Sequence, residues 1–95
     1  MKFENKLEGA SNFRAWKVRI DILLAKNKVL DIVKGNVVEP KDDAGKSKFK
    51  EDDINTISII VDSIRDHLVP YIEKLDTSKK IYDALMNLYT IKNVS

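Results

Sequence analysis

The segment around Gly45-Lys46-Ser47 contains the residue types and spacings that come closest to a chemical motif. These three residues end like a phosphate-binding loop, but Pro40 stands where that motif requires its first glycine. A calcium loop counted from Pro40 would place Asp42 and Glu51 at two ligand positions, yet proline at the first position supplies no side-chain oxygen. The segment therefore predicts neither a nucleotide site nor a calcium site.

Other side chains suited to catalysis or metal binding are few. His67 is the single histidine and the chain has no cysteine, so neither a usual zinc site nor a nucleophile–histidine pair can be assembled. The acidic pairs Asp42-Asp43 and Asp52-Asp53 lie among polar residues and lack the apolar surroundings typical of an acid–base site. We expect no catalytic residue, no cofactor and no metal, and a protein that binds or assembles rather than an enzyme.

The composition predicts one small folded domain. With 95 residues and 43% hydrophobic residues, the chain can form a single core, and the lack of cysteine leaves packing alone to hold it together. The net charge of +2 is too small to predict nucleic-acid binding by itself. Its distribution is uneven, because twelve basic and seven acidic side chains give +5 in residues 1–50, while five and eight give −3 in residues 51–95. This polarity favours head-to-tail contacts.

No segment predicts export or membrane insertion. The N-terminus is charged and leads into no apolar stretch, and no run approaches the roughly 18 apolar residues that a membrane span needs. We therefore expect a cytoplasmic protein with no membrane contact and no small-molecule substrate.

The first helix is predicted to begin after Ser11 or Asn12, either of which can cap its free amides. It is apolar on two sides. The stripe expected to face the core consists of Phe13, Trp16, Ile20, Leu23 and Leu24. The stripe on nearly the opposite side consists of Ala15, Val18, Ile22 and Ala25. Such a helix is either central in its bundle or packs against a partner with its second stripe.

A short second helix is predicted near residues 29–33. It ends where Gly35 can adopt the left-handed conformation of a C-terminal cap. The segment 36–48 is rich in Pro, Gly, Asp, Lys and Ser, and we expect it to form a long surface loop.

A long third helix is predicted from about Ser47 to Leu68, before Pro70 ends it. Its isoleucines are β-branched, but the apolar residues recur every three or four positions, which a strand cannot present on one face. The residues of this stripe are Ile54, Ile57, Val61, Ile64 and Leu68. A last helix from about Lys79 to Tyr89 follows a cap at residues 76–78.

Together these segments predict an all-α fold, a compact bundle of four to five helices. The predicted core consists of Phe13, Trp16, Ile20, Leu23, Leu24, Leu30, Val33, Ile57, Val61, Ile64, Leu68, Ile72, Ile81, Leu85, Leu88 and Tyr89.

Both ends of the predicted domain have a distinctive arrangement of residues. Near the start, Leu7 and Gly9 precede Asn12-Phe13 and Trp16, and near the end, residues 77–85 (Thr-Ser-Lys-Lys-Ile-Tyr-Asp-Ala-Leu) precede Leu88-Tyr89. The chain resembles the N-terminal, capsid-like region of the Gag polyprotein of copia-type LTR retrotransposons. That family has Leu-x-Gly, Asn-aromatic and Trp, then Thr-Ala-Lys-Glu-x-Trp-Asp-x-Leu and Leu-Tyr. Residues 60–72 match more loosely, and Tyr82 and Ser78 stand where Trp and Ala are more typical.

The resemblance implies a helical lobe that self-associates into virus-like particles around the RNA of the element. Its partners would be other copies of itself and other Gag regions, with any contact to RNA being indirect. We expect residues 1–10 to be a polar lead-in, 11–92 to form one capsid-like domain, and 93–95 to lead into a second lobe. The chain would then be a fragment of a longer polyprotein or a domesticated derivative.

The second stripe of the first helix is the expected assembly surface, together with an isoleucine that falls off the core stripe of the long helix. The predicted interface consists of Arg14, Ala15, Lys17, Val18, Ile22 and Ile59.

Two alternatives remain open at this point. A domesticated peptide-binding adaptor would use a groove beside Tyr82, Met86 and Tyr89. An RNA-binding module would use a basic cluster near Trp16, made of Arg14, Lys17, Arg19, Lys26 and Lys28.

Overall fold

A computed structural model describes residues 5–89, which form four α-helices and two 3-10 helices. In chain order these are η1 (Ala10–Asn12), α1 (Phe13–Lys26), α2 (Leu30–Lys34), α3 (Asp43–Asp62), η2 (Asp66–Tyr71) and α4 (Ser78–Tyr89). Within the described part, extended pairing is limited to an isolated parallel bridge between Leu7 and Ile64. The predicted all-α fold is confirmed. The predicted end of the lobe, 93–95, lies outside the described residues.

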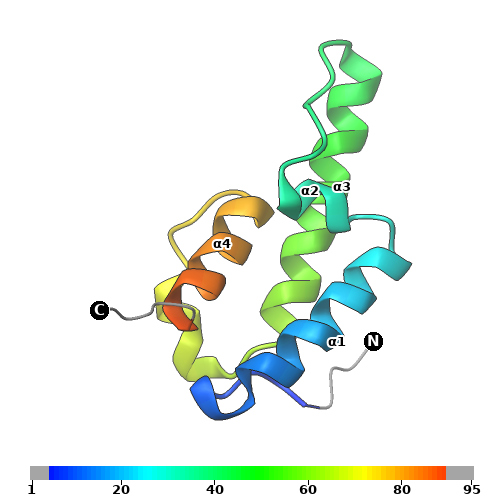
Figure 1. Ribbon diagram of the computed structural model, residues 1–95. Coiled ribbons are helices and arrows are strands. Elements are labelled where there is room, and N and C mark those ends of the chain that lie inside the picture. Colours follow the sequence, from blue (N-terminus) through cyan, green and yellow to red (C-terminus); the bar gives the residue numbers. More distant parts are fainter. Residues whose placement is uncertain (1–4, 90–95) are drawn as a thin grey trace.

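Helices α1 and α4 pack against α3, helix α2 packs against α4 and α1, and the N-terminal turns of α3 extend beyond the other helices (Figure 1). The body measures 43 × 33 × 23 Å along its principal axes. Among the helices of residues 5–89, none has both the length and the hydropathy needed to cross a membrane.

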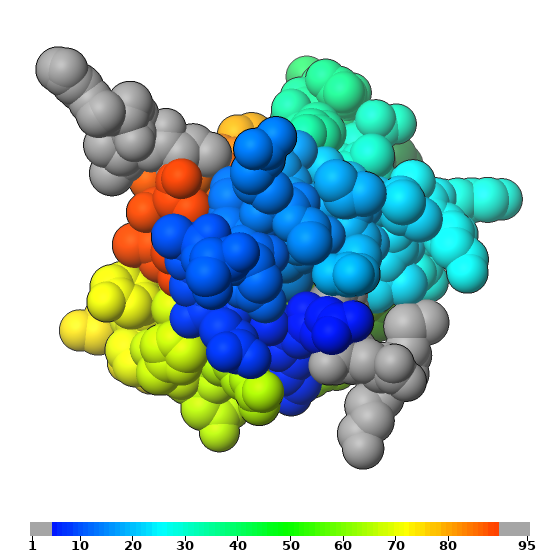
Figure 2. All heavy atoms as spheres, turned by 60° about the horizontal axis from the view of Figure 1, so that its bottom comes forward, coloured from blue at the N-terminus to red at the C-terminus, as the bar shows by residue number. Residues whose placement is uncertain are grey.

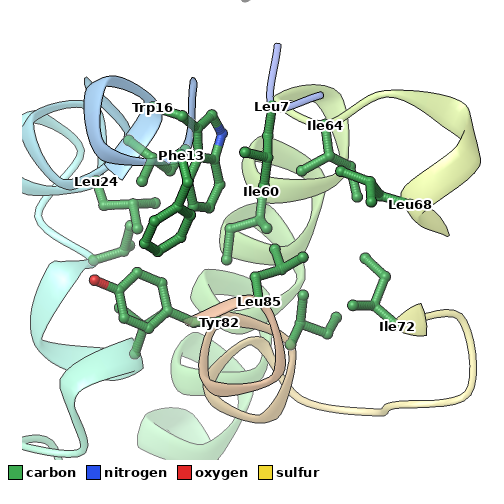
Figure 3. Close-up of a cluster of buried hydrophobic side chains, with 14 of the residues drawn as sticks. Leu7, Phe13, Trp16, Leu24, Ile60, Ile64, Leu68, Ile72, Tyr82 and Leu85 are labelled. Atoms are coloured by element: carbon green, nitrogen blue, oxygen red, sulfur yellow. The ribbon is translucent and has the colours of Figure 1, made fainter. Parts of the chain in front are cut away.

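The core lies where α1, α3 and α4 meet (Figure 3). Ten of the predicted core residues are buried: Phe13, Trp16, Ile20, Leu24, Val33, Ile64, Leu68, Ile72, Ile81 and Leu85. The other six are half-buried and pack against that cluster: Leu23, Leu30, Ile57, Val61, Leu88 and Tyr89. Five buried hydrophobic residues were not predicted: Leu7, Val29, Ile32, Ile60 and Tyr82.

Residues 1–4 of the expected lead-in lie outside the described part, and residues 5–10 are not a separate polar segment, because Leu7 is fully buried. The amide of Leu7 donates to the carbonyl of Ser63 over 2.8 Å, and its carbonyl accepts from the amide of Arg65 over 3.0 Å. This pairing places the segment around Leu7 against the end of α3. Residues 5–10 therefore contribute to the domain itself.

Helix α3 begins at Asp43, four residues before the predicted start, so the connecting loop covers 36–42 rather than 36–48. A carboxylate oxygen of Asp42 accepts a hydrogen bond from the amide of Gly45 over 2.8 Å and caps the helix. A β-carbon at Gly45 would lie 2.5 Å from that of Pro40, so the glycine allows the loop to pass close to the helix. Gly45 thus has a structural role in the motif-like segment.

Helix α3 also ends earlier than predicted, at Asp62 instead of Leu68. Beyond it, Ile64 lies in the bridge to Leu7, and both Leu68 and Pro70 belong to η2. The chain leaves the helix here because the carbonyl of Ser63 accepts hydrogen bonds from outside α3.

The buried face of α3 differs from the predicted one as well. Thr56 and Ile60 are fully buried, whereas Ile54 is 56% exposed. Burial of the threonine is tolerated because its hydroxyl donates to the carbonyl of Asp52, one turn earlier, over 2.6 Å.

The ends of α2 and α4 follow the predicted capping residues. Gly35 closes α2 in the left-handed conformation, with φ of 78°. At the start of α4 the hydroxyl oxygen of Thr77 accepts from the amide of Lys80 over 3.2 Å. The same helix start is tied to α3, because the hydroxyl of Ser78 donates to Asp53 over 2.5 Å.

Candidate assembly surface

Leu7, Asn12 and Trp16 hold the N-terminal segment against the end of α3, and we call this arrangement the N-terminal clamp. The side chain of Asn12 accepts hydrogen bonds from the amides of Glu8 and Gly9 and donates to the carbonyl of Lys6. Asn12 was expected to cap the following helix, but its side chain bonds backward to the preceding turn. This turn directs Leu7 into the core.

Trp16 completes the clamp from the first turn of α1. Its indole nitrogen donates to the carbonyl of Ser63 over 3.0 Å and lies 3.1 Å from the hydroxyl oxygen of the same residue. The ring is fully buried beside Phe13, with ring centroids 5.9 Å apart. The inner side of α1 is thereby fixed against α3 (Figure 3).

A second fixed contact joins α1 to α4. The hydroxyl of Tyr82 donates to Asp21 over 2.6 Å, and the other oxygen of that carboxylate accepts from Lys17 over 2.9 Å. Lys34 lies over the tyrosine ring, 5.2 Å from its centroid. Burial, followed by the bond to the Asp21 carboxylate, raises the pKa of Tyr82 well above its ordinary value.

The outward side of α1 is open to solvent (Figure 2). We call its exposed line the α1 outer stripe, defined as Arg14, Val18, Ile22 and Lys26, which follow each other at intervals of four residues. Val18 is 60% exposed and Ile22 is 57% exposed. Two branched apolar side chains therefore sit on adjacent turns with a cation at each end.

The predicted interface residues do not all lie on this stripe. Arg14 and Ala15 are exposed beside Val18 and Ile22. Lys17 is only half-exposed and points to the Asp21 contact at the boundary with α4. Ile59 is half-buried and packs against the core, because it neighbours the buried line of Thr56 and Ile60. The prediction that Ile59 lies on the solvent-exposed side of the long helix is wrong.

The residues of the basic cluster predicted for RNA binding do not all remain available in the structure. Lys17 is neutralised by Asp21, and Trp16 is buried and cannot stack on a base. Within residues 5–89, the cations Arg14, Arg19, Lys26 and Lys28 are exposed and form no ion pair with a carboxylate. These four charges give α1 and the turn that follows it a positive potential.

A peptide-binding groove was expected beside Tyr82, Met86 and Tyr89. In the structure Tyr82 is not exposed to solvent there. Tyr82 is only 3% exposed, and Met86 packs half-buried against the core. The ring of Tyr89 lies 5.2 Å from that of Phe13, centroid to centroid. These side chains pack against the core on the inner side of α4, so Tyr82 is not accessible to a peptide.

Shallow hollows mark the surface of α3. One of about 390 Å³ is lined by Ser47, Lys50, Glu51, Ile54 and Asn55. Another of about 510 Å³ lies over Phe49 between the loop and the start of α4. Among residues 5–89, no three His, Asp or Glu side chains gather closely enough to hold a metal ion.

Sequence reasoning missed the exposed face of α3 on which Ile54 lies. We call this line the α3 outer stripe, defined as Glu51, Ile54, Ser58 and Asp62, all of which are exposed. Thr56 and Ser63 could have indicated that the opposite face is buried. Small hydroxyl residues can be buried in a helix because the hydroxyl donates a hydrogen bond to a backbone carbonyl one turn earlier.

Comparisons of the chain with protein-family models, curated proteins and solved structures give no match.

Proposed function

We propose that this chain is a structural domain of the Gag type, similar to the capsid region of copia-type retrotransposons, and that it acts by self-association. The proposal is supported first by the resemblance of residues 7–16 and 77–89 to that family. In the structure these residues form the N-terminal clamp and the cap of α4, so they serve to build this fold.

The observation that carries the proposal is the exposure of Val18 and Ile22 on α1. A helix whose inner face holds Trp16 in the core has no need of branched apolar residues on its outer face. Single exposed apolar residues are common on protein surfaces, whereas contiguous apolar patches rimmed by polar residues mark interaction sites. Val18 and Ile22 adjoin each other on successive turns and lie between two cations, and this favours a contact surface. A second copy of the chain is the partner that assembly requires.

The test is sedimentation velocity of the wild type and of the double variant Val18→Asp, Ile22→Asp over a range of concentrations. We expect the wild type to associate and the variant to associate about tenfold or more weakly, as for residues central to an interface. The matched control is Val37→Asp, Val38→Asp, because these exposed valines lie on the loop away from α1. It should associate like the wild type.

Two results contradict the proposal. One is a wild type that stays monomeric at the highest concentration reached. The other is a Val18→Asp, Ile22→Asp variant that keeps the circular-dichroism spectrum of the wild type and still associates equally well.

RNA binding is a second candidate function, favoured by the exposed cations Arg14, Arg19, Lys26 and Lys28, which pair with no carboxylate in the described part of the chain. It predicts a monomer whose affinity for RNA falls steeply as salt is raised, because bound counterions are released. Fluorescence anisotropy with a labelled RNA at several salt concentrations distinguishes it from self-association.

A further inference from the structure

The α1 outer stripe is poorly suited to contact its own counterpart in a second copy. Its ends are Arg14 and Lys26, and the nearby carboxylate of Asp21 is already bonded to Lys17 and Tyr82. If two such stripes met, in parallel or antiparallel, cations would face cations at both ends. Like charges brought together in an interface oppose association.

The α3 outer stripe has the opposite arrangement. Glu51 and Asp62 lie near its ends, exposed, and neither forms an ion pair within residues 5–89. Between them lies Ile54, 56% exposed, on the edge of the hollow of about 390 Å³, which Lys50 also lines beside Glu51. Ser58 is small and leaves room for a neighbouring helix.

The two stripes also match in length. Arg14 and Lys26 are twelve residues apart and Glu51 and Asp62 are eleven apart, so each pair of charges spans about 17–18 Å along its helix. In both stripes the apolar side chains lie between the charges. The hollow beside Ile54 offers a place for Val18 or Ile22 of another copy.

We propose that the α1 outer stripe of one copy docks against the α3 outer stripe of a second copy. This inference rests on the proposed self-association and names the second surface that it uses. Because the two surfaces differ, the contact is heterologous, and each copy keeps one free surface of each kind. Repetition produces a ring or an open chain of copies instead of a closed two-fold dimer.

Charge reversal on each stripe tests the pairing. In Arg14→Glu, Lys26→Glu the α1 outer stripe becomes acidic, and in Glu51→Lys, Asp62→Lys the α3 outer stripe becomes basic. We expect each variant alone to associate about tenfold or more weakly than wild type in sedimentation velocity at physiological salt. An equimolar mixture should recover association, because every acidic stripe then has a basic stripe to meet.

The result that overturns the inference is normal association of Glu51→Lys, Asp62→Lys by itself, or a mixture that remains as weak as its components. The first means that α3 takes no part, and the second that the two stripes do not face each other. All four positions are exposed, so each variant should keep the wild-type circular-dichroism spectrum. If a reversal disturbs folding, Arg14→Gln, Lys26→Gln and Glu51→Gln, Asp62→Asn replace it, and each should still weaken association.

Failure of the inference and of the proposed function are distinguishable. If Val18→Asp, Ile22→Asp weakens association and the α3 variants do not, the proposed self-association holds and α3 is rejected as the partner surface. A monomeric wild type rejects both.

Discussion

The indole nitrogen of Trp16 donates a hydrogen bond to the carbonyl oxygen of Ser63, 47 residues further along the chain, over 3.0 Å. The same oxygen accepts from the amide of Leu7 over 2.8 Å. One buried carbonyl at the end of α3 therefore joins the N-terminal segment, α1 and α3. Leu7 and Trp16 meet at this atom.

Replacement of Trp16 by Phe is expected to lower the free energy of unfolding by about 2–4 kcal/mol, because it removes a buried hydrogen bond and leaves unfilled volume. Urea unfolding followed by far-ultraviolet circular dichroism measures the change without depending on the lost fluorophore. Tyr71→Phe, at an exposed aromatic residue, should change stability by less than about 0.5 kcal/mol. Equal effects of the two substitutions contradict the role given to Trp16.

Leu7→Ala is expected to lower the free energy of unfolding by about 2–5 kcal/mol, as for other fully buried leucines. A polar lead-in outside the domain would tolerate this change without loss. Val38→Ala serves as the control, since Val38 is 85% exposed and should shift stability by less than about 0.5 kcal/mol. The same urea titration compares both variants with wild type.

Asp53 receives hydrogen bonds from the amide and the hydroxyl of Ser78, over 3.2 and 2.5 Å. Asp53→Ala leaves the buried hydroxyl without this acceptor and should cost about 1–3 kcal/mol of stability. Asp83→Ala breaks an exposed pair with Lys79 and should cost less than about 1 kcal/mol. Thermal unfolding of the two variants is the measurement, and a larger loss for Asp83→Ala counts against the α3–α4 link.

Stability is expected to fall as the pH rises above about 10, the ordinary pKa of tyrosine. Because the pKa of Tyr82 is raised in the folded state, the unfolded chain loses its tyrosine proton at a lower pH than the folded chain. The stabilisation is therefore complete below this pH and is lost as the pH increases further.

Denaturant midpoints measured between pH 8 and pH 11 test this prediction, because this range includes the ordinary pKa of tyrosine, about 10. In Tyr82→Phe the decline above about pH 10 should be shallower than in wild type, because the phenyl ring has no proton to lose. Tyr71→Phe is the control and should keep the wild-type slope, since Tyr71 is largely exposed. An unchanged slope in Tyr82→Phe contradicts the raised pKa of Tyr82, which comes first from burial and then from the bond to Asp21.

The sequence by itself determined the fold class and the parts of it that depend on neighbouring residues. The spacing of Phe13, Trp16 and Ile20 predicts α1 and its inner face, and Gly35 predicts the end of α2, because period and capping are local properties. The second apolar line with Val18 and Ile22 was also visible. The exposure of this second line could not be predicted from the sequence, because a helix with apolar residues on two sides can pack against the core with either side.

Only the tertiary structure decided which face of α3 is buried and where that helix ends. Isoleucines lie on several sides of α3, so several stripes fit the helical period, and packing against the rest of the core buries Thr56 and Ile60. Leu7 and Trp16 bind the carbonyl of Ser63 at the end of the same helix. The same contact draws the carbonyl of Ser63 out of the helix. These outcomes depend on atoms 47 or more residues apart, and no local pattern of side chains encodes such a distance.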